Sequence, residues 1–460
     1  MAELSVIKRL PEIIRNCERT FDDILKKPYV ERFTYEEVIM PNDEEKVPVN
    51  EFYQGDNLLA MERLLKNGYR GKIDLIYIDP PFMTKSNQEG KIVIKDGEKD
   101  YAIEQVAYED NWDEGIVSYL NMLCPRLYLM RELLSEKGTL YVHLDYRTVH
   151  YVKILLDCIF GVENFLNEII WAYKSGGVSN RYYSRKHDTI LVYTKTKDYI
   201  FNPQKEKSYN RDFKPYRFKG VEEYQDELGW YTLVNLKDVW QIDMVGRTSK
   251  ERVGYATQKP EKLLERIILT SSNEDSIVAD FFAGSGTTGV VAERLNRRWI
   301  MSDSGDLSSI TVYKRIMDNP LKAYRSFKEK GKIRNGGKLL VKDAKIDDDV
   351  LNIQLNRYMI NIDHLNIKEK YKLKIEELIH NNSLALIDFI GLDLDYDGQV
   401  PLISKKIVRT DNKTIDSFIA IKGIFKEGQK IFVRYVDVFG KGNFDIYQIA
   451  NGSMILCQEY

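Results

Sequence analysis

The stretch from Lys72 to Phe82 places the strongest constraint on what this chain can fold into. Residues 72–78 read KIDLIYI, an apolar run with the β-branched and aromatic content of a buried strand. Asp79-Pro80-Pro81-Phe82 follows at once. Because two consecutive prolines fix φ and donate no N–H group, the backbone must leave the sheet stiffly. We therefore expect a parallel strand that ends at these four residues, at the edge where open α/β sheets bind ligands.

The four residues also have a chemistry of their own. An acid, rigid carbonyl groups and an aromatic ring meet at one point, which suits a flat heterocycle with an exocyclic amine. Asp79 and the Pro80 carbonyl would accept the two N–H bonds of that amine, and Phe82 would stack on the ring. Taken alone, the tetrapeptide is equally compatible with a strand followed by a proline-rich turn.

A second strand-loop-helix unit lies at residues 276–303. Its strand, Ser276 to Asp280, runs into the loop Asp280-Phe281-Phe282-Ala283-Gly284-Ser285-Gly286-Thr287-Thr288. This loop has neither the G-x-G-x-x-G pattern nor the lysine of a phosphate-binding loop. Its small residues let a ligand approach the backbone, and Asp280 suits a ligand with a cationic ammonium group. The next strand ends at Asp303, about 20 residues after the glycines, where a Rossmann-like unit places a carboxylate for ribose hydroxyls.

Gly55-Asp56-Asn57 gives a third strand-to-helix junction, after a strand expected over Val47 to Tyr53. Asp and Asn are good N-caps, so a purely structural role is also open. Gln258-Lys259-Pro260 precedes a further helix, with Pro260 at a position typical of a helix start.

Composition limits the remaining choices. A chain of 460 residues with 43% hydrophobic and 30% charged residues is an ordinary globular protein of two to three domains. The four cysteines lack paired spacing and the five histidines form no ligand cluster, so we expect reduced thiols and no metal. No signal peptide or membrane-spanning run is visible, which favours a cytoplasmic location.

The segment from Trp171 to Gly220 differs from the rest of the chain. It carries twelve Lys and Arg but four Asp and Glu, with interleaved Tyr and Phe, although the whole chain has a net charge of −2. Clustered cations with aromatic rings are typical of nucleic-acid binding, although a solvated basic face is the alternative. The predicted DNA-contacting residues are Lys174, Arg181, Tyr182, Tyr183, Arg185 and Lys186.

The two ends of the chain carry less chemistry. Residues 1–48 are expected to form a helical extension, with helices over residues 4–25 and 35–39, and residues 83–107 a mobile loop. Residues 326–384 are expected to form a linker and helical region, and residues 385–460 a β-sandwich-like domain.

With Asp79-Pro80-Pro81-Phe82 placed before the glycine loop, the sequence resembles the DNA amino-methyltransferases whose catalytic motif precedes their cofactor motif. It is most similar to the modification subunits of type III restriction systems and to related site-specific adenine methyltransferases. The resemblance covers residues 50 to 320. It includes the stretches Trp171 to Gly177 and Thr257 to Pro260. Two departures are Asp-Phe-Phe at residues 280–282, where Asp-Pro-Phe is usual, and Asp303, where many members have Glu.

The resemblance implies a Rossmann-like α/β catalytic domain over residues 49–325, with a target-recognition region inserted at about residues 171–250. It implies methyl transfer from S-adenosylmethionine to N6 of a flipped-out adenine in double-stranded DNA. Asp79 to Phe82 would be the catalytic motif. The residues at the cofactor would be Asp280 to Thr288 at the methionine moiety, Asp303 at the ribose, Asp56 near the adenine ring, and Gln258, Lys259 and Pro260 closing the site.

Three other functions are also compatible with the sequence. Transfer to N4 of cytosine, a DNA-binding relative without turnover, and, more remotely, a nicotinamide dehydrogenase are the alternatives. A restriction subunit with helicase and endonuclease activity and a second copy of the chain are candidate partners.

Overall fold

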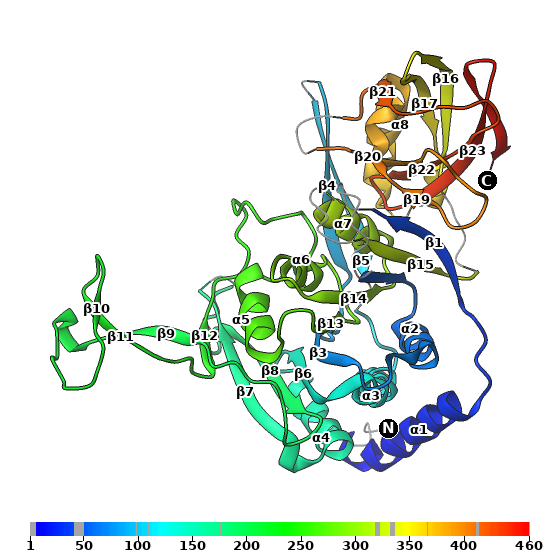
Figure 1. Ribbon diagram of the computed structural model, residues 1–460. Coiled ribbons are helices and arrows are strands. Elements are labelled where there is room, and N and C mark those ends of the chain that lie inside the picture. The colour runs from blue at the N-terminus through cyan, green and yellow to red at the C-terminus, as the bar shows by residue number, and fades with distance from the viewer. Residues whose placement is uncertain are drawn as a thin grey trace.

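The protein is described by a computed structural model that covers residues 6–40, 50–97, 99–108, 110–174, 177–317, 323–331, 336–365, 367–410 and 414–459. A large mixed sheet crosses the centre of the molecule (Figure 1). Within the described ranges it has 11 strands, which lie in this order: β12 (Val239–Gln241), β7 (Phe165–Ala172), β8 (His187–Thr194), β6 (Leu134–Leu144), β3 (Ile73–Ile78), β13 (Ile277–Asp280), β14 (Arg298–Asp303), β2 (Asn50–Gln54), β15 (Tyr324–Glu329), β1 (Phe33–Ile39) and β19 (Leu402–Ile403).

Helices cover both faces of this sheet. One face packs against α2 (Asn57–Leu64), α3 (Ile116–Leu133) and α4 (Val149–Phe160), with α1 (Val6–Lys26) packed on α3, and the other face packs against α5 (Glu261–Ser271), α6 (Thr287–Arg294) and α7 (Asp306–Met317). Strand β3 shows why. Ile76 and Ile78 are buried on the side of the sheet that α2, α3 and α4 cover, whereas Leu75 and Tyr77 are buried on the side that α5, α6 and α7 cover. A strand with two buried faces needs the continuous apolar run that the sequence shows.

The strands that carry the two motifs are direct neighbours. Strands β6, β3, β13, β14 and β2 are parallel, and β3 pairs with β13 at Leu75–Val278 and Ile76–Ala279. The chain runs from β3 toward β6 on one side and from β13 to β14 on the other. The carboxyl ends of β3 and β13 therefore meet at a topological switch point, the place where such sheets bind ligands. The predicted α/β fold with a Rossmann-like sheet is confirmed.

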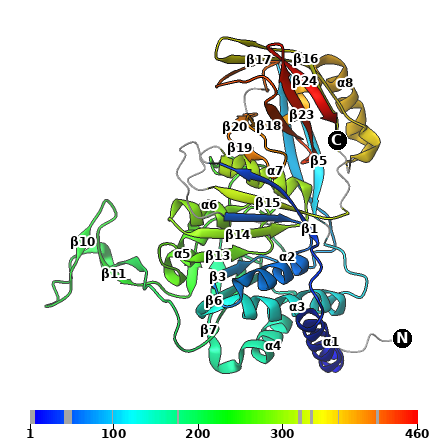
Figure 2. The ribbon, with the colours of Figure 1, turned by 45° about the vertical axis from the view of Figure 1, so that its right-hand side comes forward.

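Residues 83–107 are not the mobile loop that their composition suggests. They form a long hairpin of β4 (Gln88–Asp96) and β5 (Lys99–Tyr108), which rises beside the C-terminal part of the chain (Figure 2). Ile92 and Ile94 alternate with exposed residues on β4, as Tyr101 and Ile103 do with half-buried ones on β5. This period-2 pattern, rather than the charged composition, decides the structure.

The N-terminal segment is also only partly helical. Helix α1 is present, but residues 35–39, expected as a helix, belong to strand β1. Strand β1 pairs antiparallel with β15 and parallel with β19, partners about 290 or more residues away in the chain, so its conformation depends on tertiary pairing. The strand expected from Val47 is described from Asn50 as β2, and residues 41–49 lie outside the described ranges.

The region around the basic segment, residues 165–241, divides into two parts. Strands β7, β8 and β12 belong to the edge of the central sheet. Between β8 and β12 the chain extends into a narrow arm that projects from the body (Figure 1). The arm holds a small antiparallel sheet of β9 (Lys205–Tyr209), β10 (Tyr224–Gln225) and β11 (Trp230–Asn235).

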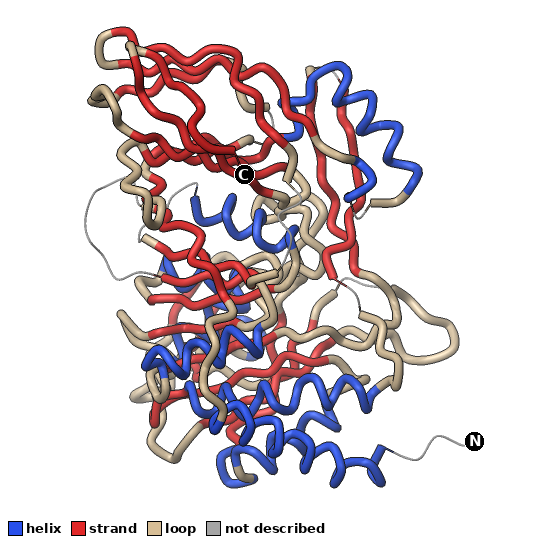
Figure 3. The backbone as a smooth tube through the Cα atoms, turned by 90° about the vertical axis from the view of Figure 1, so that its right-hand side faces the viewer, coloured by secondary structure: helices blue, strands red, loops and turns tan. Residues whose placement is uncertain are grey.

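A separate β-rich body follows the central sheet and lies at the opposite end from most of the helices (Figure 3). Its described antiparallel strands are, in order, β20 (Lys405–Val408), β18 (Ile387–Asp393), β22 (Lys430–Asp437), β23 (Gly442–Ala450), β24 (Ser453–Glu459), β16 (Lys338–Asp347), β17 (Val350–Met359) and β21 (Phe418–Lys422). Residues 338–359, where the sequence predicts a linker or helices, thus supply two long strands, and α8 (Lys372–Asn382) follows them. The Lys345–Ser453 pair joins β24 to β16, so the described strands form one continuous, curled ladder.

Candidate functional site

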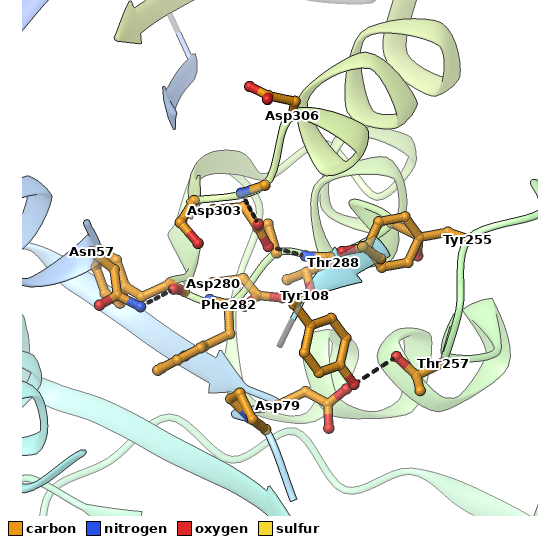
Figure 4. Close-up of a pocket in the computed structure, with 18 of the residues that line it drawn as sticks. Asn57, Asp79, Tyr108, Tyr255, Thr257, Asp280, Phe282, Thr288, Asp303 and Asp306 are labelled. Carbon is orange, nitrogen blue, oxygen red and sulfur yellow. Dashed lines mark hydrogen bonds between the residues drawn. The ribbon is translucent and has the colours of Figure 1, made fainter. Parts of the chain in front are cut away.

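A cavity of about 700 Å³ opens at the carboxyl ends of β2, β3, β13 and β14 (Figure 4). It brings together segments that are far apart in the sequence. Thirteen of the predicted site residues line it: Asp56, Asp79, Pro81, Lys259, Asp280, Phe281, Phe282, Ala283, Gly284, Ser285, Thr287, Thr288 and Asp303. The predicted residues Pro80, Phe82, Gln258, Pro260 and Gly286 lie beside it but do not contribute to its lining. The sequence motifs on either side of the switch point therefore face one space.

Asp79 is held between two basic side chains. The Lys259 ammonium donates to Asp79 Oδ2, although 180 residues separate the two. Asp79 Oδ1 is buried and accepts no hydrogen bond from any described residue. His143 Nδ1 lies 3.8 Å from it. The carboxylate is 17% exposed, so one edge of it still faces the cavity.

The segment after the prolines is fixed by a single buried acid. Asp110 accepts from the backbone N–H groups of Met83 and Thr84, at 2.9 and 2.7 Å, and from the indole of Trp112 at 3.0 Å. Met83 has a φ of +59°, which costs energy for a residue with a side chain. Phe82 is held at the mouth of the site, with its ring 5.6 Å from His143 and 5.4 Å from the Lys259 ammonium. The aromatic ring and the carboxylate are thus preorganised with respect to each other.

The glycine loop brings backbone close to the cavity. Gly284 and Gly286 have φ values of +51° and +74°, a region that residues with a side chain rarely adopt. A Cβ atom at Gly286 would lie 2.8 Å from Val312 Cγ2, so this turn packs tightly on α7. The Gly284 N–H group donates to Asp303 Oδ2 and the Gly305 N–H group to Oδ1, both at 2.8 Å. These two bonds fix the direction of the Asp303 carboxylate toward the cavity.

Asp280 is the most perturbed acid of the site. Burial raises the pKa of its carboxyl to about 7, against the lowering effect of bonds from Thr288 Oγ1 at 2.6 Å and the Phe282 N–H group at 2.9 Å. The charges of Asp79 and Asp303 add to the rise in pKa. A cationic ligand in this cavity would reverse that effect, because a nearby positive charge stabilises the carboxylate.

Asp56 has two structural bonds in addition to its place in the lining. Its Oδ1 accepts from the Leu58 N–H group at 2.8 Å, as the N-cap of α2, and from Arg126 Nη2 at 2.7 Å. Asn57 donates to the Phe281 carbonyl at 2.6 Å and so ties α2 to the glycine loop. The capping alternative raised by the sequence and the lining role are therefore both present at Asp56.

The three residues before α5 have different tasks. Gln258 accepts from the Val253 N–H group at 2.9 Å and closes its own loop. Pro260 stands at the N-cap position of α5. Lys259 alone reaches the cavity, and its carbonyl accepts from Thr287 Oγ1 at 3.2 Å.

Several lining residues were not singled out from the sequence. Tyr108 reaches the cavity from the end of β5, and its hydroxyl lies 3.4 Å from Thr257 Oγ1 (Figure 4). Tyr255, Arg126 and Asp306 also line the cavity. Tyr108 could have been found had the β5 alternation been followed to the end of that strand. Asp306 and Arg126 carried no signal, because they reach the site only through tertiary packing.

The C-terminal body reaches the same cavity. Lys441 lines it and pairs with Asp306 Oδ2, and Gln54 donates to Asp306 Oδ1 at 2.7 Å. A Cβ atom at Gly440 would lie 2.1 Å from the Asp306 carbonyl oxygen, so the turn before Lys441 sits directly on the start of α7. The β-rich body therefore contributes Lys441 to the lining of the cavity, which its sequence did not indicate.

The predicted DNA-contacting residues lie on the loop between β7 and β8 and are solvent-facing. Tyr182 and Tyr183 are 58% and 99% exposed. The Arg185 guanidinium stacks on Tyr182 and on Tyr146, at 4.7 and 4.0 Å from the ring centres. Lys174 and Arg181 are exposed, whereas Lys186 is half-buried and donates to the Lys174 carbonyl at 3.4 Å. Residues 175 and 176 of this loop lie outside the described ranges.

Two further features bear on the kind of site. The described residues contain no group of three or more His, Cys, Asp or Glu side chains placed to hold a metal ion. In the same residues, no helix has both the length and the apolar character needed to cross a bilayer.

Comparison with known proteins agrees with this geometry. A family model described as DNA methylase matches residues 73–307, which include both motifs. The type II methyltransferase M.HpaI of Haemophilus parainfluenzae is 32% identical over 270 residues, 59% of this chain and 76% of that protein.

Two other relatives carry more descriptive names. The DNA adenine methyltransferase YhdJ of Escherichia coli K12 is 28% identical over 253 residues, 54% of this chain and 75% of that protein. The Mod subunit of the type III restriction-modification enzyme EcoP15I of Escherichia coli is 28% identical over 163 residues, 33% of this chain and 25% of that subunit.

Proposed function

This chain belongs to the DNA methylase family, and we propose that it transfers the methyl group of S-adenosylmethionine to N6 of an adenine flipped out of duplex DNA. The observation that carries the proposal is the meeting of Asp79 and the glycine loop in one cavity at the switch point of the sheet. One motif offers an acceptor for an exocyclic amine, and the other offers a ligand site with acidic groups.

The described residues fit S-adenosylmethionine. A cavity of about 700 Å³ is in the range of small-molecule sites. Asp303 is directed into it by two backbone N–H groups, and a carboxylate oxygen that accepts one such bond can accept another from a ribose hydroxyl. Asp280, buried and with a raised pKa, suits the ammonium of a methionine moiety. When bound, S-adenosylmethionine supplies a methyl group activated by the adjacent sulfonium.

The catalytic task of the chain is to make the amine nucleophilic and to hold it. The N6 lone pair of adenine is delocalised into the ring, so acceptance of its N–H bonds by Asp79 and the Pro80 carbonyl favours a pyramidal nitrogen. The same acceptors stabilise the positive charge that develops on N6. Phe82 gives a stacking face to the flipped base, and the rigid turn fixed by Asp110 supplies the positioning.

Adenine is favoured over cytosine by the acid that opens the motif, since cytosine-N4 enzymes more often carry serine at that position. The name of the relative YhdJ, a DNA adenine methyltransferase, supports the same choice. Methylation of cytosine N4 is the second candidate, and base analysis of the product separates the two.

DNA would be held by two exposed regions. The loop between β7 and β8 leads into β8 at the carboxyl end of β6, where Thr189 pairs with Leu144, and β6 is the neighbour of β3. The arm adds exposed Arg211, Lys214, Arg217 and Lys219, together with the exposed rings of Phe213 and Phe218. Among the acids of the arm, Glu223 accepts the N–H groups of Tyr216 and Arg217, at 2.8 and 2.7 Å. Residues 205–235 carry six Lys and Arg and six Asp and Glu, so target recognition by the arm would rest on these exposed cations and rings and not on a net positive charge.

Partners beyond DNA follow from the relatives. Similarity to the EcoP15I Mod subunit and to M.HpaI supports a role in restriction-modification, with a restriction subunit and a second copy of this chain as candidate partners. A DNA substrate and unpaired cysteines accord with a cytoplasmic enzyme.

The test uses purified protein, methyl-labelled S-adenosylmethionine and unmethylated genomic DNA, followed by digestion to nucleosides. Label in N6-methyladenine supports the proposal, and label in N4-methylcytosine replaces it with the second candidate. If no base is labelled while cofactor binding is intact, the proposal fails for the isolated chain.

A further inference from the structure

Behind Asp79, on the side away from the cavity, lies a buried imidazole that the reaction described above does not use. His143 is fully buried on β6, the strand next to β3. Its ring lies among aromatic side chains, with centres 5.6 Å from Phe82 and 5.3 Å from Trp171. A buried histidine whose two ring nitrogens both face polar groups is a stronger candidate for function than one that only fills space.

The two nitrogens of this ring have different partners. Nε2 lies 3.3 Å from Asp188 Oδ2, and Nδ1 lies 2.9 Å from the Tyr77 hydroxyl and 3.8 Å from Asp79 Oδ1. Although burial by itself raises the pKa of Asp188, interaction with His143 brings that pKa below its usual value, so this carboxylate is ionised and can only accept. Nε2 therefore carries the proton of the neutral ring, and Nδ1 is the nitrogen with a lone pair.

This arrangement leaves one unmatched atom. Asp79 Oδ1 is buried and has no hydrogen-bond donor among the described residues, and His143 Nδ1 lies 3.8 Å from it. A distance of 3.8 Å is too long for a hydrogen bond, but catalytic contacts often shorten when substrate binds. The Tyr77 hydroxyl can rotate from donor to acceptor, because its hydrogen is not fixed by the ring.

Methylation of an amine produces a proton that must leave. The N6 lone pair forms the new N–C bond, the C–S bond breaks with its electron pair kept by sulfur, and N6 is left with a positive charge and one surplus proton. Asp79, which touches N6, is the first acceptor for that proton. A protonated Asp79 cannot serve the next turnover until the proton has moved on.

Resting on the proposed methyl transfer, we propose that His143, paired with Asp188, is the positioning residue that holds Asp79 and takes the proton from it. After the carboxyl group of Asp79 turns so that its protonated oxygen faces the ring, the proton passes to His143 Nδ1, and Asp188 balances the charge of the imidazolium. Asp188 also accepts from the Tyr173 hydroxyl at 3.3 Å and is 14% exposed, so it lies between the buried ring and the surface, where the proton is released.

The groups that face the ring set its pH dependence. Three groups face the ring directly: Tyr77, Asp79 and Asp188. Tyr173 and Lys259 act on it through Asp188. A ring that is already protonated cannot accept a further proton. The rate of repeated turnover should therefore fall on the acidic side, and replacement of His143 should remove that fall.

The experiment measures the rate of repeated turnover from about pH 5.5 to about pH 9, with cofactor and a duplex that contains the target site both in excess over the protein, because a proton left on Asp79 blocks the turnover that follows. His143→Gln should slow repeated turnover on the order of 10²-fold near pH 8 and remove the acidic limb. Asp188→Asn should slow it less and shift the limb to lower pH, because the imidazolium loses its counter-charge. The matched control is His150→Gln, at an exposed position of α4, which should leave rate and profile unchanged.

The outcomes separate the two proposals. A wild-type chain that labels no adenine overturns the methyl-transfer proposal itself. An active wild type whose acidic limb persists in His143→Gln overturns only the role of the histidine. If His143→Gln does not fold, the pH–rate profile of Asp188→Asn is compared with that of the wild type. An acidic limb shifted to lower pH supports the proposal, and an unshifted limb contradicts it.

Discussion

The ammonium of Lys259 lies against the carboxylate of Asp79, and the two come from segments that are 180 residues apart. This pair connects the motif at the end of β3 to the segment that leads into α5, and α5 packs against α6, the helix that follows the glycine loop. It is 11% exposed at the lysine and 17% at the aspartate, so loss of either partner leaves a largely buried charge. Because the pair lies where the two motifs meet, substitution of either residue tests the site directly.

Replacement of Lys259 by methionine should lower the rate of methyl transfer on the order of 10²-fold, because Asp79 is then without the ammonium that fixes its direction. The measurement is single-turnover methylation at saturating cofactor. Lys262→Met, at an exposed position on the first turn of α5, is the control. Equal rates for the two variants would show that the pair has no part in positioning Asp79.

Binding of S-adenosylmethionine should release up to one proton per site as pH falls below about 7. Burial raises the pKa of Asp280 to about 7 in the free protein, and a bound ammonium would lower it. The carboxyl must then lose a proton on binding, so affinity should decrease as pH falls below about 7. Titration calorimetry in buffers of different ionisation enthalpy measures this proton, and Asp280→Asn should abolish its release.

The same shift has a consequence for folding. A carboxyl whose pKa is higher in the folded than in the unfolded chain binds more protons when folded, between its ordinary pKa of 3.8 and about 7. Its contribution to the free energy of unfolding is therefore present at low pH and is lost as pH rises toward about 7. Asp280→Asn should flatten this part of the pH–stability curve for the cofactor-free protein, as followed by thermal unfolding.

The packing of the C-terminal body against the cavity can be tested at one glycine. Alanine at Gly440 would place Cβ 2.1 Å from the Asp306 carbonyl and should displace Lys441 from the wall. Removal of one charge-assisted interaction should raise the dissociation constant for S-adenosylmethionine about tenfold. Gly452→Ala is a matched control, because its φ of +69° carries similar strain while no atom lies within 4 Å. Identical dissociation constants for Gly440→Ala and Gly452→Ala would show that the C-terminal body takes no part in cofactor binding.

The arm should contribute to DNA binding by neutralising phosphates. Arg217→Ala with Lys219→Ala should weaken duplex binding and lower the slope of log K against log salt by about one for each phosphate that is no longer neutralised. Lys426→Ala with Lys430→Ala removes the same charge from exposed positions of the C-terminal body. Fluorescence anisotropy over a series of salt concentrations gives both quantities. A salt slope that changes equally in the two pairs would argue against a specific role of the arm.

The parts of the site that were predictable are those fixed by local sequence. The apolar run before Asp79 and the glycine loop after Asp280 specify a strand end and a turn, and two such units in one parallel sheet meet at a switch point. The family resemblance supplied the ribose role of Asp303, and the structure directs that side chain into the cavity.

The parts that were missed depend on interactions between distant segments. Strand β1 exists because β15 and β19 pair with it, and the β4–β5 hairpin buries one face that its charged composition conceals. His143 on β6 gave no motif of its own, since its partners Asp79 and Asp188 come from β3 and β8. Lys441 reaches the cavity only because the turn at Gly440 packs on α7. Such residues become visible when the register of the sheet and the docking of the two bodies are known.

The measurement that tests the account most directly is single-turnover methylation by Asp79→Asn, a replacement of nearly the same shape that removes only the charge. Asp74→Asn on the same strand is the control, since its carboxylate accepts from Ser135 at 2.7 Å, away from the cavity. We expect Asp79→Asn to bind S-adenosylmethionine and DNA as the wild type does and to lose N6-methyladenine formation by at least about 10²-fold. Wild-type rates in Asp79→Asn would contradict the assignment of this carboxylate as the acceptor of the adenine amine.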